Sequence, residues 1–216
     1  MSTYDYPVSL AVEDFAPVLF TTAGVLLLSR ILTPARAVPA AALIGAGGSA
    51  KATAKLIAAT GGPDLPWLRD LLFPLLSLGF GLLCLALGRQ RTGETPRWML
   101  LLVPGLIMLC GLGAILAADP IPLLVSTTVF ATIAGVHLIA LARARGDTAT
   151  AALFGTQLLV FFILGPLASR PDQTVALQWV EQLCNTAAQA AFLLAAWRLP
   201  RAPAPAPADP DKEMIR

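Results

Sequence analysis

The stretch that decides the fold is GGSAKATAKL, residues 47–56. It places two lysines, Lys51 and Lys55, four residues apart inside a long run of small and apolar residues. Lysine is among the most expensive residues to place in lipid. If this run crosses the membrane the chain has seven spans, and if it does not, every later loop changes sides. The reason for the two lysines therefore bears on both topology and function.

Composition predicts an all-α integral membrane protein. Of the 216 residues, 56% are hydrophobic and only 13% are charged, whereas a soluble domain is roughly a quarter charged. Apolar runs of about 20 residues, the length of a transmembrane helix, recur along most of the chain. The candidate spans are residues 15–32, 37–60, 67–88, 97–118, 121–142, 149–169 and 174–198.

Charge bias decides between six and seven spans. With seven, the loops on one side carry Arg30, Arg36, Arg89, Arg91, Arg97, Arg143, Arg145, Arg198 and Arg201. The loops on the other side carry Asp64, Asp119, Asp172 and a single arginine, Arg170. Without the span at 37–60, Arg30 and Arg36 would lie across the membrane from most of the other arginines. The positive-inside rule therefore favours seven spans, with the N-terminus outside and the C-terminus inside.

The same topology divides the chain into three parts and indicates a bacterial cytoplasmic (inner) membrane protein. Residues 1–14 form an extracytoplasmic N-terminal segment, which has no basic leader and does not look like a cleavable signal peptide. Residues 15–199 form the transmembrane domain. Residues 200–216 alternate alanine and proline before turning charged, which predicts a disordered cytoplasmic tail.

Self-comparison indicates an internal repeat. Four short matches share one order and have offsets between 108 and 112 residues: AALIG at 41–45 with AALFG at 151–155, FTTAGV at 20–25 with FATIAGV at 130–136, PD at 63–64 with PD at 171–172, and Trp67 with Trp179. They predict repeat one at about 15–90, a linking helix at 97–118 and repeat two at about 121–199. Two parallel three-helix halves of this kind place a binding site near the midplane between them.

In overall plan the chain resembles SWEET-type sugar transporters, nicotinamide riboside transporters and microbial rhodopsins. The resemblance is one of architecture and implies a seven-helix bundle. The chain has no PQ dipeptide, and its seventh span has no lysine that could hold retinal. No functional residue is therefore carried over from these families.

The glycines before the lysines allow two interpretations. Residues 45–49 read GAGGS, and small residues of this kind let neighbouring helices pack closely. Interrupted helices in repeat-built transporters also mark binding sites, because unwound backbone is tolerated where it lines a cavity. The sequence leaves both interpretations open.

The lysines themselves break the predicted repeat. Lys51 lies near the middle of its span, and Lys55 lies one turn further out on the same face. Their counterparts in repeat two are near Phe161 and Gly165. A lysine at a helix centre costs about 2.5–3.5 kcal/mol on insertion, so both should face a partner or a hydrated interior.

The seventh span offers the predicted partners, because polar residues recur on it at helical spacing. They are Gln178, Glu181, Gln182, Asn185 and Gln189. Glu181 lies at a depth similar to that of Lys55, and Asp70 at the outer end of the third span is a second candidate counter-ion. One interpretation is a structural ion pair between helices. The other is a pocket that binds an anionic group, with the predicted substrate-binding residues Lys51, Lys55, Asp70, Glu181, Gln182, Asn185 and Gln189.

Two classes of function follow. The first is a transporter of a small polar or anionic solute, with its site between the two halves. The second is a non-transporting membrane protein: a small-ligand sensor, a lipid-modifying enzyme or an assembly subunit of a membrane complex. The single histidine excludes bis-histidine haem and disfavours a three-histidine hydrolase. The three cysteines show no disulfide or metal spacing. No catalytic residue, metal, cofactor or nucleic-acid partner is expected, and an enzyme is the less favoured class. The expected partners are the lipid bilayer and the solute. A homo-oligomer or a partner in a membrane complex is left open.

Overall fold

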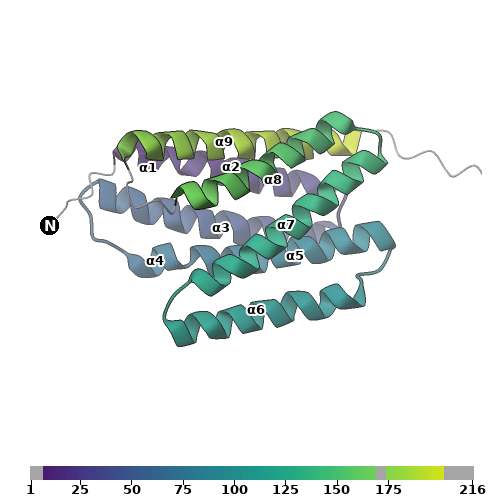
Figure 1. Cartoon of the computed structure of the whole chain (residues 1–216), viewed down its shortest axis with the longest axis horizontal. Helices are drawn as coiled ribbons and strands as arrows, with labels where there is room; N and C mark the ends of the chain where they lie inside the picture. Colours follow the sequence, from purple (N-terminus) through teal and green to yellow (C-terminus); the bar gives the residue numbers. More distant parts are fainter. Residues whose placement is uncertain (1–6, 169–173, 202–216) are drawn as a thin grey trace, which may run out of the picture.

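The computed structural model describes residues 7–168 and 174–201, and within these ranges the chain is helical and contains no strand (Figure 1). The first half contains α1 (Val8–Glu13), α2 (Phe15–Leu27), the 3-10 turn η1 (Leu28–Arg30), α3 (Pro34–Ala59), α4 (Pro66–Asp70) and α5 (Leu72–Thr92). The second half contains α6 (Arg97–Ala117), α7 (Ile121–Ala144), α8 (Thr148–Ala168), α9 (Val175–Arg198) and the 3-10 turn η2 (Leu199–Arg201). The predicted extracytoplasmic residues 1–6 and most of the predicted tail lie outside the described residues.

Each predicted span coincides with a long helical unit, and the first unit extends furthest beyond its prediction. Its helix begins at Val8 and is interrupted only at Asp14, whose backbone is still right-handed helical, so that residues 8–13 form about a turn and a half of helix in front of the predicted span. Similarly, α4 and α5 form one unit with a break at Leu71. The predicted N-terminal segment is therefore helical from Val8 onward.

Four of the units are long and apolar enough to cross a membrane: Val8–Arg30, Pro66–Gln90, Arg97–Ala117 and Ile121–Ala144. A shorter apolar helix covers Thr148–Leu164. Helices α3 and α9 are as long, but they contain the lysines and the polar stripe. The structure is thus that of an α-helical membrane protein.

The helices are arranged as a ring with one helix outside it. In order around the ring, neighbours in contact are α2, α3, α5, α7, α8 and α9, and α9 returns to α2. Helix α6 packs against α5 and α7 from outside the ring (Figure 1). It exposes much of its apolar surface, including Leu101, Ile115 and Leu116, each more than three-quarters exposed, as a lipid-facing helix does.

The buried core lies in the half of the bundle next to the arginine-bearing ends. All the ring helices contribute to it, and its members include Leu28, Ala40, Leu83, Phe130, Phe154 and Phe192. The rings of Phe154 and Phe192 meet edge to face with centroids 5.7 Å apart. The other half of the bundle contains Lys51, Lys55 and the polar stripe of α9, on the outer side of this apolar core.

The GAGGS segment is a close-packing surface within an unbroken helix. Helix α3 runs continuously from Pro34 to Ala59. A Cβ on Gly48 would lie 2.7 Å from Val18 of α2, and one on Gly47 would lie 3.1 Å from the carbonyl oxygen of Leu72 in α5. Of the two interpretations open in the sequence, the structure supports close packing.

Candidate functional site

Two consecutive carboxylates at the junction of α1 and α2 connect α3 to α9. Asp14 Oδ2 lies 2.8 Å from Lys55 Nζ on α3. Glu13 Oε1 accepts a hydrogen bond of 2.9 Å from Thr186 Oγ1 on α9. Because successive side chains on a helix point about 100° apart, these two neighbouring side chains reach different helices, α3 and α9. The α1–α2 junction is therefore the centre of the polar cluster in the outer half.

The ion pair explains how Lys55 is accommodated. The side chain of Asp14 is 12% exposed and that of Lys55 is 30% exposed. Asp14 also stands at the N-terminus of α2, where the helix dipole favours a negative charge. The sequence analysis sought the counter-ion of Lys55 on the seventh span or at Asp70, but the structure supplies a carboxylate from the first. Removing one member of such a pair leaves the other charge uncompensated.

Lys51 differs from Lys55 in forming no ion pair with the residues that the structure describes. It lies one helical turn deeper on α3 and is half-buried. No hydrogen bond or ion pair joins it to another residue in the part of the chain that the structure describes. Among the described residues, Lys55 thus has a carboxylate partner within the bundle, and Lys51 forms no such contact.

The polar stripe of α9 faces the bundle and meets α1 and α2. Gln182 Nε2 donates to the carbonyl oxygen of Glu13 at 3.4 Å. Gln189 Oε1 accepts from Thr21 Oγ1 at 2.9 Å, and Gln189 Nε2 donates to Asn185 Oδ1 at 3.4 Å. These amides are half-buried, whereas the opposite face of α9 is exposed and apolar.

The predicted site residues divide into two groups. Lys51, Lys55, Gln182, Asn185 and Gln189 belong to the outer half of α3 and α9, with α1 and α2 between them. Glu181 is half-buried on α9, and its pairing with a lysine stays a prediction. Asp70 lies elsewhere: it lines a groove formed with α6 and α7.

Four contributors were not among the predicted site residues: Glu13, Asp14, Thr21 and Thr186. The sequence analysis placed the first two in the extracytoplasmic segment. The sequence signal that could have identified Glu13 and Asp14 is that two acids stand directly before an apolar run, on the same predicted side of the membrane as the nearer end of the span that contains Lys55. The hydroxyls gave no signal, because threonines in membrane helices commonly bond back to helix carbonyls, as Thr21 also does to Pro17.

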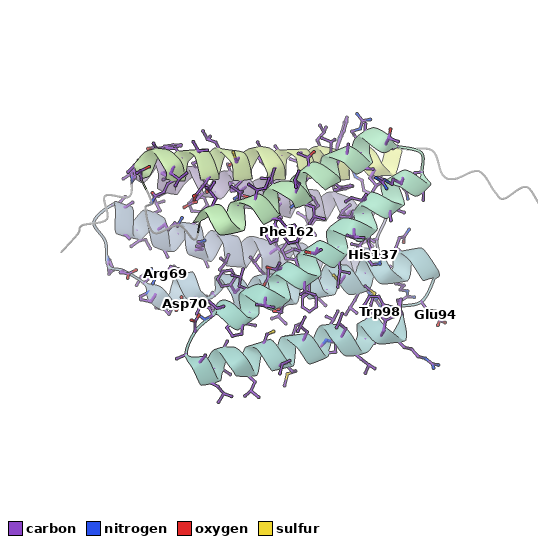
Figure 2. All side chains as sticks on the ribbon, in the orientation of Figure 1. Arg69, Asp70, Glu94, Trp98, His137 and Phe162 are labelled. Carbon is purple, nitrogen blue, oxygen red and sulfur yellow. The ribbon has the colours of Figure 1, made fainter. Side chains whose placement is uncertain are left out.

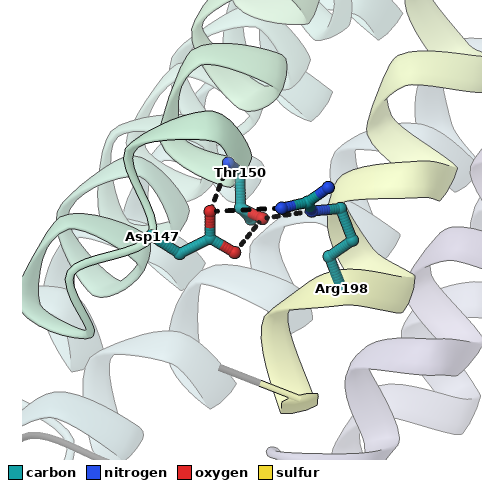
Figure 3. A network of polar contacts seen from close by, with 3 residues as sticks. All are labelled: Asp147, Thr150 and Arg198. Carbon is teal, nitrogen blue, oxygen red and sulfur yellow. Dashed lines mark hydrogen bonds and ion pairs between the residues drawn. The ribbon is translucent and has the colours of Figure 1, made fainter. Parts of the chain in front are cut away.

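A second polar cluster fastens the inner end of the bundle (Figure 3). Asp147, in the turn before α8, accepts hydrogen bonds from Thr150 Oγ1 at 2.6 Å and from the Thr150 amide at 2.9 Å. Arg198 of α9 donates to Thr150 Oγ1 at 3.3 Å and lies 3.7 Å from Asp147 Oδ1. The two Thr150 hydrogen bonds, aided by the Arg198 charge, hold the pKa of Asp147 below its usual value. This cluster caps α8 and ties it to the end of α9.

The remaining buried polar contacts are uncharged. Ser77 of α5 and Ser126 of α7 share a hydrogen bond of 2.7 Å, and both are fully buried. Among the described residues, no group of histidine, cysteine and acidic side chains could hold a metal ion.

Fold and site together define the class: an α-helical integral membrane protein with a charged and amide-lined cluster in one half of its bundle. Comparison of the chain with protein-family models, with curated proteins and with solved structures gives no match. The roles of its residues are accordingly argued from their geometry alone.

Proposed function

We propose that the chain is a seven-span membrane protein, with its N-terminus outside and its C-terminus inside, that transports a small polar or anionic solute. The observation that carries the proposal is the contrast between the lysines. Lys55 forms an ion pair with Asp14, whereas Lys51, one turn deeper on α3, forms none in the described residues. An ammonium in that position persists where a hydrated cavity or an anionic ligand receives it.

Seven spans are supported by the geometry of the two polar helices. The arginine-bearing connections α5–α6 and α7–α8 lie at one end of the bundle, and the α3–α4 and α6–α7 connections lie at the other (Figure 1). On α9, Trp179 and Trp197 are 18 residues apart, which corresponds to about 27 Å of helix. That spacing matches a hydrocarbon core of about 30 Å with tryptophans at both interfaces. The Asp14–Lys55 pair in turn lowers the cost of inserting α3.

The predicted repeat agrees with the order of helices around the ring. If α2, α3 and α5 form one half and α7, α8 and α9 the other, a twofold axis relates the contact of α5 with α7 to the contact of α9 with α2. Helix α6 then lies outside both halves, as a linker would. The polar cluster occupies the junction of α9 with α2, so it lies between the halves, where carriers of this plan bind their substrates.

The burial pattern suggests a route for the solute. The charged and amide groups around the α1–α2 junction lie in the outer half, and the packed core around Phe154 and Phe192 closes the inner half. An anion entering from outside would first meet Asp14 and Lys55 as a neutral pair, then Lys51, with Asn185 and Gln189 as hydrogen-bonding groups. Between α2 and α3 the buried hydroxyl of Thr22 has no hydrogen-bond partner in the described residues, and it is a further polar group available along this route.

The test is transport by purified protein in liposomes, measured as current after a concentration step of acetate, lactate, succinate, phosphate or chloride. Lys51→Ala and Lys51→Met should abolish the current carried by the wild type, and Lys51→Arg should retain part of it. Thr53→Ala, two residues away on the same helix, is the matched control and should transport normally. Each variant must stay monodisperse in detergent.

Normal current in Lys51→Met would remove Lys51 from the site and overturn the proposal. A wild type that carries none of the five anions would favour a non-transporting role, as a sensor or an assembly subunit.

A further inference from the structure

A groove opens at the outer end of the bundle, between α5, α6 and α7, on the side of α5 that faces away from α3. Its volume is about 490 Å³, within the range of roughly 300–1,000 Å³ that holds drug-sized ligands. Pro74 and Leu78 of α5, Ile107 and Ile115 of α6, and two carboxylates, Asp70 and Asp119, line it. It shares no residue with the polar cluster at the α1–α2 junction, and Lys51 does not line it.

Three small residues of α6 leave room for the hollow. Gly111, Ala114 and Ala118 recur at helical spacing and line the groove. A Cβ built on Gly111 would meet no atom within 4 Å, so the space beside it is open. At the end of the helix Ala118 adopts a left-handed conformation, with φ 50° and ψ 37°, which turns the chain and brings Asp119 to the rim.

The two carboxylates at the rim are available to a ligand. Asp119 uses one oxygen to accept the Ile121 amide at 2.8 Å, which fixes its position and leaves its charge in place. Asp70 is exposed, and neither an ion pair nor a hydrogen bond to it occurs in residues 7–168 and 174–201. The neighbouring Arg69 directs its guanidinium toward Asp64, 3.5 Å away. Two negative charges therefore stand at the polar end of an apolar groove.

We propose that this groove binds lipophilic cations, with the positive charge between Asp70 and Asp119 and the apolar body against α5, α6 and α7. The proposal commits to this class by charge complementarity: the carboxylates repel anionic amphiphiles, and a neutral molecule gains nothing from them. The exposed apolar surface of α6 gives such a ligand access from the outer leaflet. Asp70, which the sequence analysis grouped with the lysines, takes its role here instead.

The experiment measures the binding of tetraphenylphosphonium to the full chain in an uncharged detergent by equilibrium dialysis. The wild type should bind the cation saturably, and Asp70→Asn/Asp119→Asn should weaken binding about tenfold or more. Gly111→Leu should remove binding by filling the hollow. Glu94→Gln is the control for net charge, because Glu94 and Asp70 lie at opposite ends of the bundle (Figure 2). The affinity of the Glu94→Gln variant for the cation should stay at the wild-type value.

Tetraphenylborate, an anion of nearly the same shape, separates charge recognition from simple hydrophobic binding. Equal affinity for the anion and the cation would overturn the proposal. So would wild-type affinity in the Asp70→Asn/Asp119→Asn protein, or the absence of saturable binding in the wild type. Because Lys51→Ala leaves the groove intact, that variant should bind the cation normally whether or not the transport proposal holds.

Discussion

The close approach of α3 and α5 depends on glycine, and Gly79→Ala tests this directly. A Cβ on Gly79 would lie 2.7 Å from Ile44 Cγ1, 3.1 Å from the Ala40 carbonyl oxygen and 3.2 Å from the Ile44 amide nitrogen. Two of these three atoms are backbone and cannot rotate away, so the helices must separate by a few tenths of an ångström. Overpacking of this kind costs about 1–3 kcal/mol.

The matched control is Gly105→Ala on α6, where an added Cβ would meet no atom within 4 Å. Both substitutions gain the same intrinsic helix propensity, about 1 kcal/mol, so the difference between the two variants isolates the packing term. At roughly 2–4 °C per kcal/mol for a chain of this size, Gly79→Ala should melt about 2–12 °C below Gly105→Ala.

The assay is thermal unfolding of detergent-solubilised protein, followed by tryptophan fluorescence at one fixed scan rate, because membrane proteins commonly unfold irreversibly. Equal melting temperatures for Gly79→Ala and Gly105→Ala would refute the argument, since they would mean that the α3–α5 distance is not set by the missing side chain.

Two further predictions concern the ends of the bundle. Thr150→Val should destabilise the protein at neutral pH by removing a hydrogen bond to Asp147. That hydrogen bond contributes to the lowered pKa of Asp147. The difference in unfolding free energy between Thr150→Val and the wild type should therefore be fully present above the ordinary aspartate pKa of about 3.9 and shrink as the pH falls below it. A difference that stays constant down to pH 3 would exclude this mechanism. For the topology, a fluorescent protein fused after Arg216 should fluoresce and alkaline phosphatase fused there should be inactive, whereas active phosphatase at that position would exclude an inside C-terminus.

The helical units were predictable because their signals are local. An apolar run of about 20 residues and the charges at its ends are properties of a single segment, and they predicted every long helix to within a few residues except at the N-terminus. There the apolar run appeared to begin after Asp14, because Glu13 and Asp14 interrupt it. The structure continues the helix on both sides of these acids, since each of them finds a partner on another helix.

The charge partner of Lys55 was decided by tertiary structure. Glu181 was predicted as a partner because it matched Lys55 in depth, and that pairing stays a prediction; depth along a helix does not reveal that Asp14 also lies beside Lys55. Helix α2 packs against both α3 and α9, and this places Asp14, 41 positions earlier in the chain, next to the lysine. Similarly, the sequence does not tell which face of α5 contacts α3 and which contacts α6. The packing of α5 against both helices places Asp70 in the groove beside α6.

The sequence by itself determined that this chain is a bundle of long apolar helices with arginines gathered at one end, because hydrophobic length and charge bias act on each segment independently. Only the tertiary structure decided that the GAGGS glycines serve close packing, that Lys55 pairs with Asp14 while Lys51 forms no ion pair in the described residues, and that a groove with an acidic rim opens beside α6. Each of these depends on distances between residues far apart in the chain, which are fixed only when the helices pack against one another.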